Sequence, residues 1–294
     1  MTEVIIRLLQ PGDEIALETF LLPRLETSMF LIGNMRASGL AYNGECYTGH
    51  YVAAFEEGEM VGVVAHYWNG ILITQATVHL DALWRAVVTA SRRPIKGILG
   101  PHEQVRVIKS ALEFDSAAFQ LDQRENLYSL ALRDLVIPEA LRTDQVKGRR
   151  VETRDLDILT RWRVGYEVET LGEEENDQLW AHERAMAERV IHDGNTWILE
   201  AQGQPVATSA FNSRIREAVQ IGGVWTPPEL RRRGYARCVV AQSLLDARDE
   251  GAEKAILFTG EQNIPAQKAY TALGFRYIGD YHLLMLREPL HITV

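Results

Sequence analysis

The C-terminal half of the chain alternates apolar, β-prone runs with runs of helical periodicity. Residues 219–225 are apolar and are followed by Pro227-Pro228, which end a strand because proline cannot donate to a strand ladder. Apolar side chains then recur at helical spacing over residues 235–245, and Gly251 provides a C-terminal stop. The pattern predicts a strand that stops before the prolines, a glycine turn, and a helix over residues 234–249.

The same alternation continues toward the C-terminus. Residues 255–259 form a short apolar β run, Asn263 is a natural N-cap for a following helix, and Gly274 is a natural stop. Runs at residues 276–280 and 282–287 then predict two closing strands.

The two halves of the chain begin alike. A β run at residues 4–8 resembles one at 151–154, and each is followed by a helix start. Hairpins with glycine in the turn are predicted at residues 52–64 and 197–207. A charged connector at residues 138–150 separates the halves, and 294 residues are enough for two domains. We therefore predict domains at residues 1–145 and 146–294.

The glycine turn of the C-terminal half has the composition of an anion site. Arg231-Arg232-Arg233 precede Gly234, and the small Ala236 follows within the first helical turn. Unpaired backbone N–H groups at the positive end of a helix dipole attract negative charge, and glycine allows a positive φ or a close backbone approach. A diphosphate is the best-fitting ligand.

Two motifs carry a family resemblance. Arg231-x-x-Gly234-x-Ala236 after a strand resembles the acyl-CoA pyrophosphate loop of the GNAT superfamily of N-acetyltransferases. Asn263-x-x-Ala266-x-x-x-Tyr270, followed by Gly274-Phe275, resembles the second GNAT signature. The resemblance implies an α/β (α+β) fold of two GNAT-like domains, each a mixed, mostly antiparallel twisted sheet flanked by helices.

The resemblance also implies a function and a binding site. The activity would be transfer of the acetyl group of acetyl-CoA to a primary amine of a small molecule or a protein. A GNAT-fold acyl-CoA sensor without turnover is the alternative. The residues implied for acyl-CoA binding are Val224, Trp225, Thr226, Arg231, Arg232, Arg233, Gly234, Tyr235, Ala236, Asn263 and Ala266. For Asn263, a helix cap alone would also explain the residue.

Acyl transfer to an amine needs a base and benefits from an acid. A lysine-like amine has a pKa of about 10.4 and must lose a proton before it attacks, while the leaving thiolate can take one from a phenol. The resemblance assigns the acid role to Tyr270, which could instead be a packing residue. Glu217 is a candidate base at the start of the strand, or a hairpin charge.

An acidic segment lies where the family places the loop that lines its acceptor pocket. It contains Glu167, Glu169, the run 173–175 and Asp177. An acidic pocket would favour a cationic amine, although such a run is also typical of a solvated loop.

The N-terminal half lacks a comparable anion site. Its predicted strand at residues 71–74 is followed by residues 77–84, which contain no glycine and no arginine. Later pieces still fit the architecture, with a strand at 95–99, a turn at 100–101 and a helix at 103–112. We expect a degenerate GNAT-like domain without a phosphate loop.

Composition narrows the remaining classes. The formal net charge of −9 argues against nucleic acid as a partner. We see no apolar run of membrane length, no leader and no zinc-type spacing, and Cys46 and Cys238 stand far apart. The expectation is a cytoplasmic protein with no metal and no membrane partner, and the sequence leaves a homodimer open.

Overall fold

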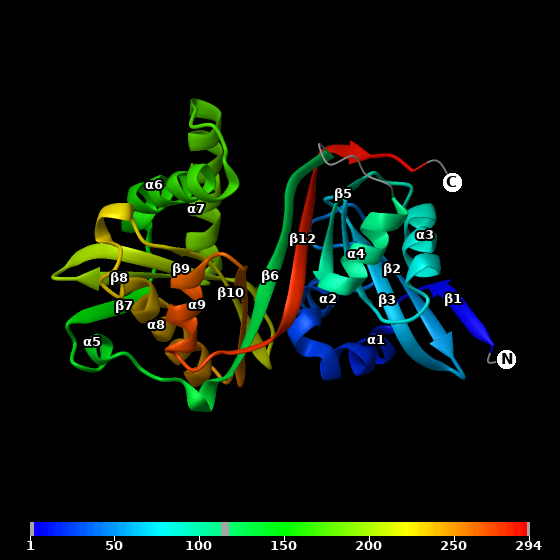
Figure 1. Cartoon of the computed structure of the whole chain (residues 1–294), viewed down its shortest axis with the longest axis horizontal. Helices are drawn as coiled ribbons and strands as arrows, with labels where there is room; N and C mark the ends of the chain where they lie inside the picture. The colour runs from blue at the N-terminus through cyan, green and yellow to red at the C-terminus, as the bar shows by residue number, and fades with distance from the viewer. Residues whose placement is uncertain (1–2, 113–117, 293–294) are drawn as a thin grey trace. The chain divides into compact units, whose positions relative to one another are not determined.

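The computed structural model describes residues 3–112 and 118–292. Its contacts divide the chain into two compact units, of which unit 1 comprises Met1–Leu127 with Gly279–Val294 and unit 2 comprises Tyr128–Ile278. Figure 1 labels the elements along the chain. The strand β6 (Phe119–Ala131) runs from unit 1 into unit 2, and β12 (Arg276–Leu290) returns from unit 2 into unit 1.

Unit 1 is a sheet with helices on both faces. Besides the segments of β6 and β12, it contains β1 (Val4–Leu8), α1 (Glu14–Leu21), η1 (Leu22–Arg24), α2 (Leu25–Ser38), β2 (Gly49–Glu56), β3 (Glu59–Tyr67), β4 (Ile71–Ala76), α3 (Leu80–Ser91), β5 (Ile95–Pro101) and α4 (His102–Ala111). Its strand order is β1-β2-β3-β4-β5-β12. Only β4 and β5 are parallel among the pairs described in this order.

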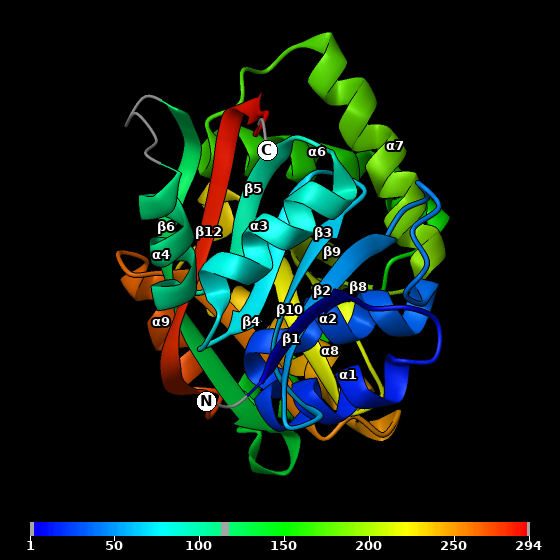
Figure 2. The same cartoon turned by 90° about the vertical axis from the view of Figure 1, so that its right-hand side faces the viewer.

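The core of unit 1 follows from the two-residue period of its strands. One face of the sheet, which includes Val64 and Leu72, packs against α3 and α4 through a cluster that contains Trp84 and Ile108. Figure 2 shows α3 and α4 lying over this sheet. Gln75, which lies on β4 three residues after Leu72, points to the opposite face, where Thr27 of α2 donates a hydrogen bond to it at 2.7 Å.

Unit 2 repeats this order of elements. After η3 (Leu132–Asp134) and α5 (Glu139–Arg142), it contains β7 (Val146–Arg150), η4 (Thr153–Asp155), α6 (Leu156–Tyr166), the π-helix η5 (Glu167–Leu171), α7 (Asp177–Asp193), β8 (Thr196–Ala201), β9 (Gln204–Arg214), β10 (Ala218–Trp225), η6 (Pro228–Leu230), α8 (Tyr235–Asp249), β11 (Lys254–Gly260) and α9 (Ile264–Thr271). Its strand order is β6-β11-β10-β9-β8-β7, and β10 and β11 are parallel, whereas the other pairs with a described register in this order are antiparallel.

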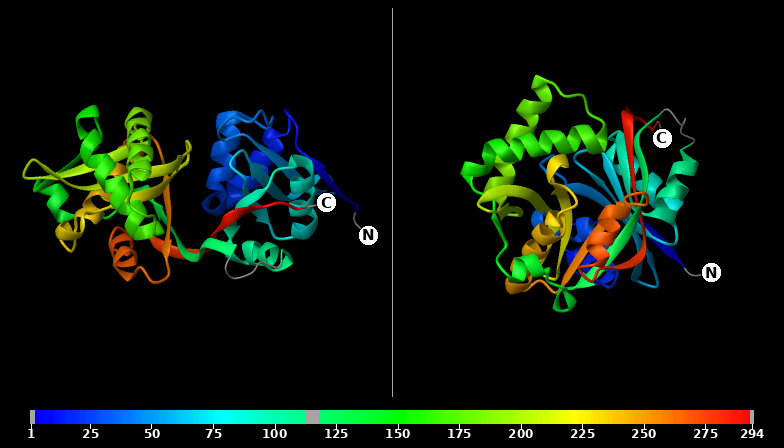
Figure 3. Two further views of the ribbon diagram at one scale, coloured as in Figure 1. Left: turned by 90° about the horizontal axis from the view of Figure 1, so that it is seen from above. Right: turned by 60° about the vertical axis from the view of Figure 1, so that its left-hand side comes forward.

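Two clusters hold the helices of unit 2 on its sheet. On one face, α8 packs through residues such as Val239 and Leu244 against Val219 and Ile221 of β10. On the other face, Trp162 of α6 and Ala187 of α7 belong to a smaller cluster. The two faces can be followed in Figure 3, which places α6 and α7 opposite α8 and α9.

The last strand of each unit's sheet comes from the other half of the chain. In unit 1, Tyr281 to Leu290 of β12 pair antiparallel with β5. In unit 2, β6 lies beside β11. The compact units therefore differ from the predicted domains at residues 1–145 and 146–294, because neither half of the sequence supplies its own closing strand.

Three predicted strands also differ from the structure. The strand predicted at residues 151–154 lies instead at 146–150, as β7. Its lysine and arginines are not typical of a strand, so the composition did not indicate one there. In the structure Arg149 is neutralised by Asp155 at 2.6 Å and by Glu200 at 2.6 Å. The two closing strands predicted at 276–280 and 282–287 are one continuous strand, β12. Strand pairing, which local composition does not reveal, decides both outcomes.

Candidate functional site

The predicted glycine turn forms an open entrance to α8. Arg232 and Gly234 have positive φ values of 64° and 80°, and Gly234 is the N-cap residue, with no side chain capping this helix end. Within the helix, Cys238 N–H is bonded to Gly234 O at 3.1 Å, so the first-turn amides of Tyr235, Ala236 and Arg237 precede the first intrahelical bond. These amides are the donors that an anion would meet.

Space above the turn is available to a ligand. A Cβ on Gly234 would have a single neighbour within 4 Å, the Arg237 Nη2 atom at 3.9 Å. The Arg237 guanidinium therefore lies beside the turn, and its buried Nε has no hydrogen-bond partner in the part of the chain that the structure describes. The two sequence motifs do not include Arg237. The signal that could have found it is its place in the first turn of α8.

Arg231 does not point freely into this entrance. Its Nη1 and Nη2 atoms pair with Oε1 and Oε2 of Glu169, each at 2.8 Å, and its Nε donates to Thr226 O at 3.0 Å. Its guanidinium also lies 4.9 Å from the centre of the Trp225 ring. Arg232 and Arg233 are exposed, and Arg233 donates to Glu229 O at 3.4 Å. At the predicted anion site, the first-turn backbone amides are therefore better placed than the Arg231 side chain to meet an anion.

The strand before the turn parts from its parallel neighbour. The ladder between β10 and β11 consists of three residue pairs, from Ala218 with Lys254 to Gln220 with Ile256, although β10 continues to Trp225. Between Gly222 and Trp225 the register with β9 also shifts. Such a bulge re-aims backbone groups, and here it contains Val224, one of the residues that the resemblance implies for acyl-CoA binding.

In unit 1 the corresponding opening is filled. The side chain of Gln104, which is 7% exposed, accepts hydrogen bonds from Thr74 Oγ1 at 2.9 Å and from Ala76 N at 2.8 Å. It thereby occupies the end of β4 beside β5. Gln104 is the third residue of α4, and the third residue of α9 is the small Ala266. The position that the Gln104 side chain fills in unit 1 therefore has only a small side chain beside it in unit 2.

The residues of the second motif lie on and around α9. Asn263 caps this helix, since its side chain accepts from Ala266 N at 3.2 Å. Tyr270 is half-buried against the core of unit 2, and its ring meets Phe275 edge-on with centroids 6.0 Å apart. Both structural interpretations of these residues are thus realised, and neither excludes a ligand contact.

Glu217 lies away from the turn. It precedes Ala218 at the start of β10, and its carbonyl accepts from the backbone N–H groups of Glu253 and Lys254. A strand of eight residues extends about 25 Å, so Glu217 is at the opposite end from Trp225. This geometry does not favour Glu217 as the base.

The acidic segment does lie at the end of β10. Tyr166 packs edge-on against Trp225 at 6.1 Å, and η5 follows Tyr166 directly. Glu167 is half-buried, and the pKa of its carboxyl is raised by burial, with repulsion from Glu183 adding to the effect. Glu183 of α7 is 2% exposed and pairs with Arg163 at 2.7 Å.

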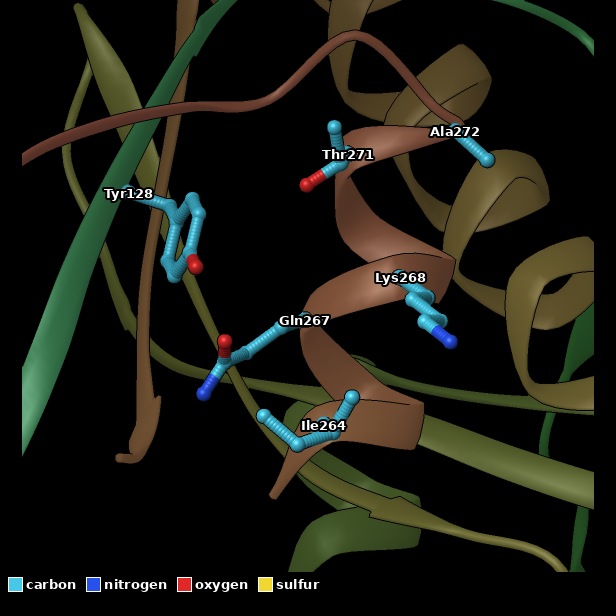
Figure 4. A pocket seen from close by; sticks show the side chains of 6 residues that line it. All are labelled: Tyr128, Ile264, Gln267, Lys268, Thr271 and Ala272. Carbon is cyan, nitrogen blue, oxygen red and sulfur yellow. The ribbon is translucent and has the colours of Figure 1, made fainter. Parts of the chain in front are cut away.

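A separate shallow depression lies on the outward side of α9. It has a volume of about 500 Å³ and is lined by Tyr128, Ile264, Gln267, Lys268, Thr271 and Ala272. Gln267 and Thr271 project from α9 toward Tyr128 (Figure 4). No residue of the turn 231–236 lines it, so it is distinct from the anion site.

Comparison with known proteins identifies the segment that carries this site. Residues 156–275 match the Acetyltransferase (GNAT) family. This segment is a GNAT domain. It lies entirely within unit 2 and contains the turn, the strand opening and Tyr270. The resemblance inferred from the two motifs is confirmed.

Solved structures extend the likeness to the whole fold. A Drosophila protein shares 12% identity with a TM-score of 0.64, and the match covers 96% of this chain and 99% of that one. A GCN5-related N-acetyltransferase from Sphaerobacter thermophilus shares 14% identity with a TM-score of 0.56 over 99% and 97% of the two chains.

A tandem GNAT protein from the clavulanic acid biosynthesis pathway shares 11% identity with a TM-score of 0.55 over 99% and 100% of the chains. At sequence identities this low, the similarity is evidence for a shared fold and not for a shared activity. The predicted fold class of two GNAT-like domains is confirmed. No curated protein matches the sequence. Every helix in the described residues is too short or too polar to span a bilayer.

Proposed function

We propose that the GNAT domain of unit 2 transfers the acetyl group of acetyl-CoA to a primary amine. The observation that supports this most strongly is the coincidence of the open α8 entrance with the parted strands β10 and β11. The amides of Tyr235, Ala236 and Arg237 would bind the diphosphate. The opening after Gln220 would take the extended arm that bears the thioester, near the backbone of Val224.

Glu167 replaces Glu217 as our candidate base. It lies in η5, next to Tyr166 and therefore near Trp225, and its raised pKa brings it closer to the working range of a general base. Glu183 is already paired with Arg163, so the carboxylate of Glu167 is the group that would make this region favourable for an ammonium ion. The proposed acceptor is therefore an amine that is cationic in solution.

The proposed reaction begins with a proton transfer. Glu167 takes one proton from the ammonium, and the freed nitrogen attacks the thioester carbonyl carbon. As the C–S bond breaks, Tyr270 gives its phenolic proton to the sulfur and regains one from the attacking nitrogen, which leaves an amide and a thiol. Glu167 then releases its proton to water, which restores the starting state of the enzyme. Holding the amine and the thioester together would supply much of the rate, up to about 7–11 kcal/mol in ideal intramolecular cases.

Thiol release tests the proposal. Acetyl-CoA and longer acyl-CoAs are incubated with pooled primary amines, and free thiol is measured with and without the protein. We expect release that depends on one amine pool.

β10 carries no carboxylate between Ala218 and Trp225, an observation that favours the alternative of a sensor without turnover. A protein that melts at higher temperature with acetyl-CoA, yet releases no thiol across the panel, would be that sensor.

A further inference from the structure

Arg231 joins the phosphate turn to the acceptor side of the domain. Both of its terminal nitrogens are used by Glu169 of η5, at 2.8 Å each, while its Nε holds Thr226 O at 3.0 Å. The two residues are 62 positions apart in sequence. Because the guanidinium fork is fully occupied on that side, Arg231 cannot grip Glu169 and a diphosphate in the same bidentate way.

The pair is built so that it can be exchanged. The side chain of Arg231 is 38% exposed and that of Glu169 is 49% exposed, and an ion pair this exposed contributes little to stability. A diphosphate carries more charge than one carboxylate and matches the same planar fork. The weak ion pair with Glu169 therefore holds Arg231, the first residue of the turn, and a diphosphate would compete for Arg231 effectively.

The partner segment has an unusual helical geometry. η5 is a five-residue π-helix that ends at Leu171, and the capping residue Gly172 that follows has a φ of 72°. π-helical turns are rare and are often found at functional sites. Release of Glu169 would remove an ion pair that ties this turn to the phosphate loop and would leave an uncompensated carboxylate on η5, the element that also carries Glu167.

We propose that Arg231 is exchanged from Glu169 to the diphosphate of acyl-CoA, so that donor binding frees η5 and makes the acceptor side more negative. The inference rests on the proposed function, since it needs acyl-CoA at the turn. Bound acyl-CoA would then strengthen the binding of a cationic acceptor. By linkage, a cationic acceptor bound at the Glu169 carboxylate would strengthen the binding of acyl-CoA by the same factor.

Calorimetric titration of acetyl-CoA tests the exchange. The Glu169→Gln variant removes the competitor for Arg231, so we expect acetyl-CoA to bind about twofold to fivefold more tightly than to the wild type. The matched control is Glu174→Gln, which removes an exposed carboxylate of the same acidic run that has no described ion pair with Arg231. In an Arg231→Gln background, Glu169→Gln should bring no gain.

Several results would overturn the exchange. Weaker binding by Glu169→Gln would show that Glu169 positions Arg231 for the ligand, and equal tightening by Glu174→Gln would reduce the effect to general charge. Hydrogen exchange gives a second readout, since acetyl-CoA should speed amide exchange at 167–171 in the wild type and not in Glu169→Gln. Equal protection of that segment in both proteins would contradict the exchange. Failure of the wild type to bind acetyl-CoA would instead refute the proposed function itself.

Discussion

Replacement of Gly234 by glutamate probes the phosphate turn most directly. Gly234 has a φ of 80°, so any side chain costs about 1–2 kcal/mol in backbone strain. Among the described residues beyond its chain neighbours, a new Cβ would come within 4 Å of one atom, Arg237 Nη2 at 3.9 Å, so the free protein has room for the side chain. The larger effect falls on the ligand, because a carboxylate about 4 Å from a phosphate charge costs about 4 kcal/mol at an effective dielectric constant of about 20.

That cost corresponds to about a thousandfold weaker binding of acetyl-CoA, which calorimetry can measure. Gly251→Glu is the matched control. Gly251 also has a positive φ, of 96°, with no atom within 4 Å of a new Cβ. It follows the other end of α8, about 22 Å away. We expect both variants to lose similar stability and only Gly234→Glu to lose affinity. Unchanged affinity, or equal losses in both, would refute the assignment of the turn.

Three further predictions concern single side chains. Tyr270→Phe should lower kcat at least tenfold with little change in acetyl-CoA affinity; equal losses in both would show that the phenol only packs against Phe275. Glu167→Gln should lower kcat by about a hundredfold or more. The pKa of Glu167 is raised, and its ionised form is required, so wild-type kcat/KM should fall as the pH drops through a value above 4.5. An acid limb that persists unchanged in the variant would assign that limb to another group. Glu125 of β6 is 6% exposed, and burial raises its pKa to about 7. Because its folded pKa lies above its unfolded one, the stability it contributes is complete at pH 4 and is lost as the pH rises through 7. Glu125→Gln should therefore raise the free energy of unfolding at pH 8 by up to about 3 kcal/mol and leave it unchanged at pH 4, as denaturant titrations would show.

The local elements of the site followed from the sequence. The predicted strand, turn and helix correspond to β10, the Gly234 turn and α8, and the predicted strand and cap correspond to β11 and Asn263. These features depend on neighbours within a few residues, namely prolines that end a strand, a glycine with positive φ and apolar side chains at helical spacing. Such signals need no knowledge of distant contacts.

The partners of the site residues did not follow from the sequence. The triple arginine suggested cations free to meet an anion, yet Arg231 is held by Glu169, which lies 62 residues earlier. The position of Glu217 was consistent with a base until the length of β10 separated it from Trp225. In each case the deciding distance joins residues that only the folded sheet brings together or holds apart.

The sequence by itself determined that unit 2 carries the two GNAT motifs and that unit 1 lacks the glycine turn. Only the tertiary structure decided that β12 closes the sheet of unit 1 and that Gln104 fills the opening beside β4. A strand carries its alternating pattern along its own length, whereas its edge partner depends on where the chain leads it. A buried glutamine is likewise recognisable as a plug only once its acceptor oxygen lies within 3 Å of Thr74 and Ala76.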